Sequence, residues 1–103
     1  MRVIAIKTLK LFASKNKTSL QPLLSWYEEA CNATWKNHNN LKEQFRNASM
    51  INDKRVVFNI HGNKFRLIVD IEYQLGIVFI VWIGTHKSYD SIDVKTISYV
   101  KTN

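Results

Sequence analysis

Histidine, arginine, lysine and tyrosine residues gather in two short segments of the second half of the chain. The first contains His61, Lys64 and Arg66, and the second contains His86 and Tyr89. Histidine can accept or donate a proton near neutral pH, while arginine and lysine stabilise charge that develops on a phosphate. The three-residue spacing of His86 and Tyr89 lets both reach one phosphate if their segment forms a helical turn. This set of side chains suits cleavage of RNA by its own 2′-hydroxyl group, with tyrosine stacking on a base or orienting it.

An alternating pattern predicts that a β-hairpin positions the first segment. Apolar residues recur at every second position on both sides of Gly62 and Asn63, and these two residues tolerate the positive φ angles of a tight turn. In this register Asn59 is opposite Arg66, and His61 is opposite Lys64. Directly opposed residues point to the same face, so these four side chains form a polar, basic face. The opposite, core face is expected to contain Phe58, Ile60, Phe65 and Leu67.

A third strand is predicted over residues 77–83. It is apolar on both faces, which is typical of a central strand covered on both sides. The expected register places Arg66 opposite Ile83 and brings the segment 85–90 beside the hairpin. Because Arg66 alternates away from the core face, its replacement is expected to cost little stability.

The first half of the chain reads as helical after a short strand over residues 3–6. Apolar residues at helical spacing predict three helices: over residues 8–14, from a cap at Thr18 or Ser19 to residues 35–37, and from a cap at Asn39 or Asn40 to residue 45. The expected architecture is one α+β domain over residues 1–103, with N-terminal helices packed on a twisted antiparallel sheet.

Composition restricts the class of partner. A chain of 103 residues that is 46% apolar can form a hydrophobic core without disulfides or metals. Its net charge of +7 favours a polyanionic partner, with nucleic acid ahead of an acidic protein or a membrane surface. Besides the proposed catalytic residues, the side chains expected to contact RNA are Asn59, Lys54, Arg55, Lys87 and Lys36.

Other chemistries find less support in the sequence. Cys31 is the single cysteine, which excludes an internal disulfide or a thiolate zinc cluster and fits a reducing compartment. The three histidines lack acidic residues at metal-ligand spacing, so neither a zinc site nor another cofactor is expected. Lys7 and Lys10 interrupt any signal-peptide region, and no apolar run approaches the roughly 20 residues that span a bilayer. A cytoplasmic protein without a membrane partner is expected.

Several segments in order resemble the HigB family of bacterial toxins, namely residues 1–4, 35–37, 57–60, 62–68 and 84–90. The resemblance implies a RelE-like fold and a type II toxin that cleaves translated mRNA on the ribosome without a metal. It also implies a cognate helix-turn-helix antitoxin, HigA-like, that keeps the toxin inactive. Arg66 matches the strand arginine of RelE-like toxins, and His86 and Tyr89 match their catalytic C-terminal segment. The paired strand lysines of RelE itself are absent, and Asn59 and His61 occupy roughly those places.

Two alternatives to a nuclease stay open. The same basic face would also serve a non-catalytic module that binds RNA or the ribosome, and a toxin-like scaffold could have lost its activity. Within the nuclease hypothesis, His61 competes with His86 for the proton-transfer role. Loss of turnover with retained binding, on removal of His86 or Tyr89, separates a nuclease from a binding module.

Overall fold

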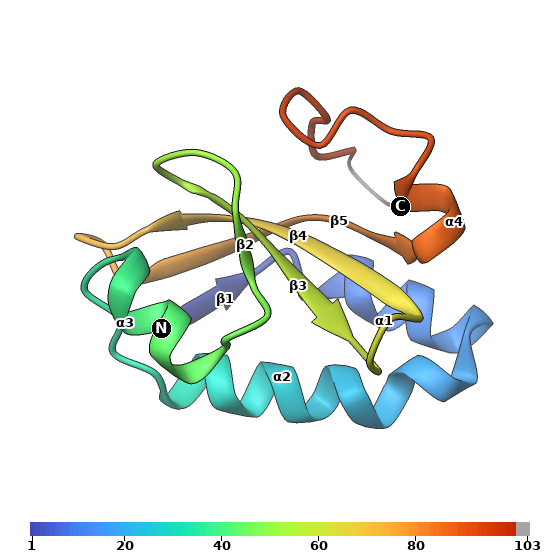
Figure 1. The fold of residues 1–103 in the computed structure, drawn as a ribbon. Helices are drawn as coiled ribbons and strands as arrows, with labels where there is room; N and C mark the ends of the chain where they lie inside the picture. Colours follow the sequence, from blue (N-terminus) through green and yellow to red (C-terminus); the bar gives the residue numbers. More distant parts are fainter. Residues whose placement is uncertain (101–103) are drawn as a thin grey trace.

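Helices cover one face of a five-stranded sheet in the computed structural model, which describes residues 1–100 (Figure 1). The elements in chain order are β1 (Arg2–Ile4), α1 (Ile6–Lys15), the 3-10 helix η1 (Lys17–Ser19), α2 (Leu20–Asn32), α3 (His38–Gln44), β2 (Ser49–Met50), β3 (Arg55–Ile60), β4 (Phe65–Glu72), β5 (Ile77–Thr85) and α4 (His86–Tyr89). The strand order is β1-β5-β4-β3-β2. The predicted α+β class is confirmed.

The expectation of a wholly antiparallel sheet is wrong at one edge. β1 pairs with β5 in parallel, while the remaining pairs are antiparallel. β1 and β5 are far apart in the chain, so their pairing is a non-local contact that the local residue pattern does not record. β5 lies between β1 and β4 and carries buried residues on both faces, so its predicted central position is confirmed.

The helices form where predicted, although several ends differ. α1 begins at Ile6, after Ala5 adopts a φ of 68° and closes the first strand at Ile4. α2 ends at Asn32, before the predicted 35–37, because Ala33 is extended. Trp35 lies beyond the helix and is buried in the core, where its indole N–H donates to Gln44 Oε1 at 2.9 Å.

The third helix is capped by Asn37, two or three residues before the predicted Asn39 or Asn40. The Oδ1 of Asn37 accepts a hydrogen bond from the backbone N–H of Asn40 at 2.9 Å, as expected of an asparagine N-cap. The run of asparagines offers three candidates, and packing of the buried Leu41 against the core selects among them.

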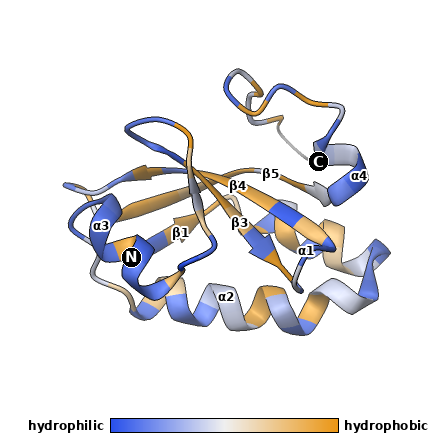
Figure 2. Cartoon of the chain, in the orientation of Figure 1, coloured by the Kyte–Doolittle hydropathy of each residue, from blue (hydrophilic) through white to orange (hydrophobic). Residues whose placement is uncertain are grey.

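The main core lies between the sheet and the helices. Figure 2 shows that apolar residues predominate in the strands and recur along α1 and α2. Phe58 is its centre and meets Trp26 edge-on with ring centroids 5.4 Å apart. The predicted core residues of the hairpin, Phe58, Ile60, Phe65 and Leu67, are all buried here.

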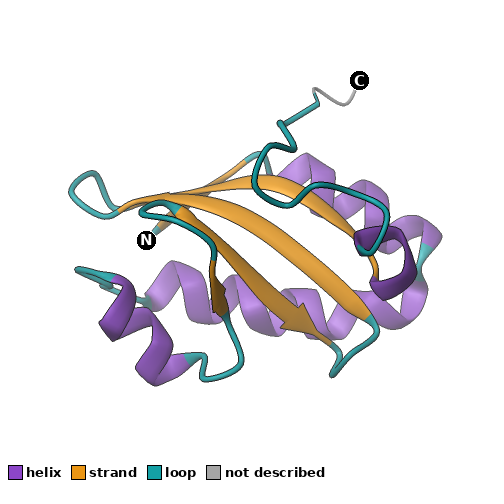
Figure 3. Ribbon diagram, turned by 45° about the horizontal axis from the view of Figure 1, so that its top comes forward, coloured by secondary structure: helices purple, strands orange, loops and turns teal. Residues whose placement is uncertain are grey.

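The other face of the sheet is covered by the irregular C-terminal segment, residues 90–100, which crosses it in Figures 1 and 3. Its side chains pack on a small second core of Val57, Ile68 and Val81. Arg55 anchors the segment from beneath. Its guanidinium is paired with both carboxylate oxygens of Asp70, at 2.8 and 2.9 Å, and its Nη1 donates to three carbonyls of the segment, those of Val94, Lys95 and Ile97.

We expect Arg55→Ala to lower the free energy of unfolding by about 2–3 kcal/mol, because it removes a buried ion pair and leaves the three carbonyls without their donor. Asp70 retains access to water, which keeps the loss below that of a fully buried pair. Urea denaturation measures the change. Lys54→Ala is the matched control, since the neighbouring Lys54–Glu72 pair is exposed and should matter little. Equal stability of the Arg55 variant and the wild type would contradict this anchoring role.

Candidate active site at the end of the sheet

The hairpin places Asn59 and Arg66 side by side as predicted. They are paired across β3 and β4, and Ile60 pairs with Phe65. On the other side, Arg66 is opposite Gly84 rather than Ile83. The cause is a β-bulge in β5. Val69 pairs with Ile80 but Ile68 pairs with Trp82, so Val81 has no partner and the register of the following pairs shifts by one residue. Asn59, Arg66 and Gly84 consequently form one row across three strands.

The predicted position of His61 on this polar face is wrong. His61 and Gly62 adopt the positive φ angles of the turn, 55° and 64°, so β3 ends at Ile60 and His61 leaves the alternation of the strand. Its ring lies 6.4 Å from that of Phe65, which belongs to the core face. His61 is therefore directed away from Arg66.

Arg66 is the centre of the candidate site. It is 8% exposed, and its guanidinium lies among polar groups of the turn and of α4. Its Nη2 donates to His86 Nδ1 at 2.8 Å and to Asn63 Oδ1 at 3.2 Å, while Nη1 donates to the carbonyls of Asn63 and Phe65, both at 3.2 Å. Because the buried Arg66 guanidinium joins the hairpin turn to α4, we expect its replacement to cost more stability than the strand alternation alone indicates.

The His86 side chain faces Arg66 because α4 begins where β5 ends. The Thr85 hydroxyl caps this single turn by accepting from the backbone N–H of Ser88 at 3.0 Å. The backbone N–H of His86 donates to the carbonyl of Lys64 at 2.9 Å, which ties α4 to the hairpin turn. Since arginine can only donate, Nδ1 of His86 is the accepting nitrogen and Nε2 carries the proton. Nε2 lies 3.6 Å from a carboxylate oxygen of Asp90.

Tyr89 closes the site on its remaining side. The guanidinium carbon of Arg66 lies 5.9 Å from the centroid of the Tyr89 ring, within cation–π range, and the Trp82 ring lies 6.3 Å from the same ring. Trp82 extends over Gly84, where an added Cβ would lie 2.3 Å from the indole. Gly84 is therefore the residue that lets Trp82 support Tyr89. The predicted helical turn that brings His86 and Tyr89 together is confirmed.

The lysines expected to contact RNA divide between the two ends of the sheet. Lys64 and Lys87 are exposed beside the Arg66–His86–Tyr89 cluster, and Asn59 is exposed in its row. Lys36 lies at the opposite end, beside Tyr73 and Gly76 of the β4–β5 turn.

Lys54 and Arg55 also lie away from the cluster, at the start of β3. Lys54 pairs with Glu72, and this ion pair raises the pKa of the Lys54 ammonium above its ordinary value. Arg55 is buried with its donors occupied, so the expectation that it contacts RNA is not retained.

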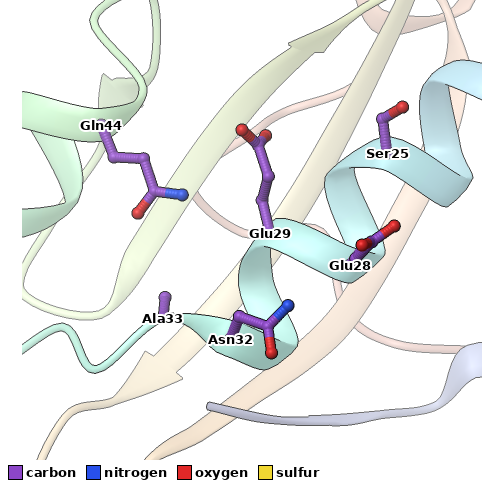
Figure 4. Close-up of a pocket in the computed structure, with 6 residues that line it drawn as sticks. All are labelled: Ser25, Glu28, Glu29, Asn32, Ala33 and Gln44. Carbon is purple, nitrogen blue, oxygen red and sulfur yellow. The ribbon is translucent and has the colours of Figure 1, made fainter.

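A depression between α2 and α3 has the opposite electrostatic character. It is lined by Ser25, Glu28, Glu29, Asn32, Ala33 and Gln44, and Figure 4 shows the Glu29 side chain extending into it toward Gln44. Two carboxylates without a lining cation repel a phosphate backbone. The positive charge that a polyanionic ligand requires lies instead at the other site, beside Lys64 and Lys87.

His38 belongs to a separate structural cluster near the β4–β5 turn. Its Nε2 donates to the carbonyl of Asn52 at 2.7 Å, and its Nδ1 is bonded to the hydroxyl of Tyr73. Burial raises the pKa of Tyr73 to about 12, so the phenol stays protonated and donates to Nδ1. His38 thus joins α3 to two loops and lies apart from the candidate site.

Two residues of the site were missed by sequence reasoning. Asn63 was assigned only to the turn, and Trp82 only to the apolar strand over residues 77–83, yet they contact Arg66 and Tyr89. The spacing of Trp82 and Gly84, two residues apart on one strand face, is a signal that could have indicated the covering indole. Within residues 1–100 no group of three or more His, Cys, Asp or Glu side chains is placed to hold a metal ion. The same residues contain no helix long and apolar enough to cross a membrane.

The protein is a small α+β protein with helices on one face of a mixed sheet. Its candidate site is an arginine–histidine–tyrosine cluster at one end of the central strands. Comparison with protein-family models assigns residues 19–92 to the HigB toxin family, the RelE-like toxic component of a toxin–antitoxin system. The chain belongs to this family, so the resemblance noted from the sequence is confirmed. Members of this family are the toxin of a toxin–antitoxin pair, so an antitoxin is the partner that the family implies. No curated protein matches the chain significantly.

Proposed function

We propose that this toxin is an endoribonuclease that cleaves translated mRNA on the ribosome through attack by the ribose 2′-hydroxyl group. The observation that supports the proposal is the contact of Arg66 with both His86 and Tyr89, which brings a guanidinium, an imidazole and a phenol ring together. In the proposal these groups act as cation, proton-transfer group and stacking ring. Exposed Lys64 and Lys87 beside them supply further positive charge for RNA. The protein is proposed to act in the cytoplasm, and its antitoxin to be a helix-turn-helix protein.

In the proposed mechanism the scissile phosphate replaces Asn63 and His86 as acceptor for the Arg66 guanidinium. Nδ1 of His86 then has a free lone pair and accepts the proton of the 2′-hydroxyl as its oxygen attacks phosphorus. Arg66 stabilises the added negative charge. The bond to the 5′-oxygen breaks, and the protonated His86 returns the proton to that oxygen, which leaves a 2′,3′-cyclic phosphate and a 5′-hydroxyl. The Asp90 carboxylate near Nε2 favours the transient imidazolium.

Induced expression of the protein in bacteria is expected to arrest growth and to produce codon-positioned cuts in a reporter mRNA. Primer extension on that reporter maps the cuts, and Arg66→Ala expressed at the same level is the control. Co-expression of the neighbouring gene in the genome, as the source of the antitoxin, should restore growth. Normal growth at confirmed expression would overturn the toxin activity.

A non-catalytic module that binds RNA or the ribosome is the second candidate. It is favoured by the burial of Arg66, whose Nη donors all have protein acceptors in this conformation. Such a module would slow translation without cutting the reporter. Arrest of growth with an intact transcript would therefore favour binding over cleavage. A toxin-like scaffold that has lost its nuclease activity would likewise leave the transcript intact.

A further inference from the structure

An apolar groove runs between α1 and α2 and has no role in the proposed chemistry. Its volume is about 250 Å³, and it is lined by Ile6, Leu9, Lys10, Ala13, Leu20, Leu23, Leu24 and Tyr27. The floor consists of core residues such as Leu9 and Leu23, which are buried. The groove is therefore a surface extension of the main core.

The rim of the groove exposes two large apolar side chains. Leu20 and Leu24 lie one turn apart on α2 and are 45% and 50% exposed. Keeping two adjacent leucines in contact with water is unfavourable, at roughly 25 cal/mol for each Å² of apolar surface. Leucines at this spacing beside an apolar groove are typical of a surface that receives an amphipathic helix from a partner.

The charge around the groove indicates the chemistry of that partner. α1 and η1 together contain four lysines and no acidic residue, and Lys10 itself lines the groove. Carboxylates placed beside the apolar residues of a helix bound here would be attracted to these lysines and would favour its binding. Glu28, the acidic residue that follows on α2, does not line the groove but an adjoining depression that shares Leu24 and Tyr27 with it.

The groove and the candidate active site lie on opposite sides of the sheet. α1 and α2 pack beneath it in Figure 1, whereas α4 and the C-terminal segment lie above it, and Figure 3 shows the same separation. A helix bound in the groove would leave Arg66 and Tyr89 open, so docking and RNA cleavage can be measured independently.

We propose that this groove docks an amphipathic helix of the antitoxin, with its apolar residues on Leu20 and Leu24 and an acidic residue near Lys10. The inference rests on the antitoxin partner of the proposed function and not on the proposed cleavage of RNA. It assigns the surface that recognises the antitoxin to α1 and α2, outside the catalytic cluster.

The test measures binding of the full-length protein to the purified product of the neighbouring gene by calorimetry. Leu24→Asp is expected to weaken binding at least about thirtyfold, as for a central apolar contact, and Lys10→Glu to weaken it less. Leu75→Asp is the matched control, because Leu75 is 71% exposed in the β4–β5 turn, away from the groove. Circular dichroism verifies folding, and Leu20→Ser provides a second, milder variant. Leu24→Asp should still arrest growth, but co-expression of the neighbour should no longer relieve the arrest.

Several outcomes would overturn the proposal. These are equal binding of the Leu24 variant and the wild type, the absence of a complex between the wild type and the neighbour's product, and a wild-type dimer that Leu24→Asp dissociates. Loss of ribosome association in the same variant would assign the groove to the ribosome instead. None of these results depends on catalysis, because a protein without nuclease activity can still bind its antitoxin.

Discussion

Arg66→Ala is expected to lower the rate of mRNA cleavage by about 10²–10³-fold, the loss typical of removing one group that stabilises transition-state charge. In the free protein Arg66 is buried and bonded to Asn63 and His86, so the variant loses both the cation and the position of His86. Cleavage of a reporter mRNA on programmed ribosomes measures the effect. An unchanged rate would remove Arg66 from the site.

Because Arg66 is buried, a stability control must accompany this measurement. We expect Arg66→Ala to cost about 1–2 kcal/mol through its lost hydrogen bonds, and Arg66→Lys to cost less while recovering only part of the activity. A lysine keeps the charge but has a single nitrogen in place of the planar guanidinium, so it cannot reproduce the contacts that Nη1 and Nη2 of Arg66 make with Asn63, Phe65 and His86. A loss of cleavage rate no larger than the fraction of the variant that is unfolded would indicate that Arg66 has only a structural role.

His86→Ala is expected to retain RNA binding and to cut at least about a hundredfold more slowly, the usual contribution of a general acid–base group. The geometry supports His86 over its rival, because His86 contacts Arg66 and His61 is directed toward Phe65. Binding and cleavage assays on programmed ribosomes separate the two effects. His61→Ala, a histidine at the same end of the sheet but off the polar face, is the matched control.

Two further measurements decide the roles within the cluster. Tyr89→Phe keeps the ring over Arg66 and should lose little if Tyr89 acts by stacking, whereas a large loss would assign its hydroxyl to proton transfer. A cleavage rate independent of pH between about 5.5 and 8, where histidines usually titrate, would exclude an imidazole from the mechanism. If His61→Ala is inert and His86→Ala cuts normally, the assignment of the two histidines is reversed.

The sequence alone determined the hairpin and the central strand. Period-two alternation around Gly62 places Asn59 opposite Arg66 whatever the rest of the fold, because pleating sends directly opposed residues to the same face. The apolar character of both faces of β5 likewise predicted its burial. These are local consequences of side-chain period, and they are confirmed.

What the sequence left open depends on non-local packing. The bulge at Val81 moves Arg66 from Ile83 to Gly84, and the backbone of the turn directs His61 to the core side. The irregular segment held by Arg55 covers the second sheet face without any periodic signal. Each of these features is stabilised by contacts between residues distant in the chain. The tertiary structure alone therefore decided the particular contacts of Arg66 with His86 and Tyr89, and the exclusion of His61 and Arg55 from them.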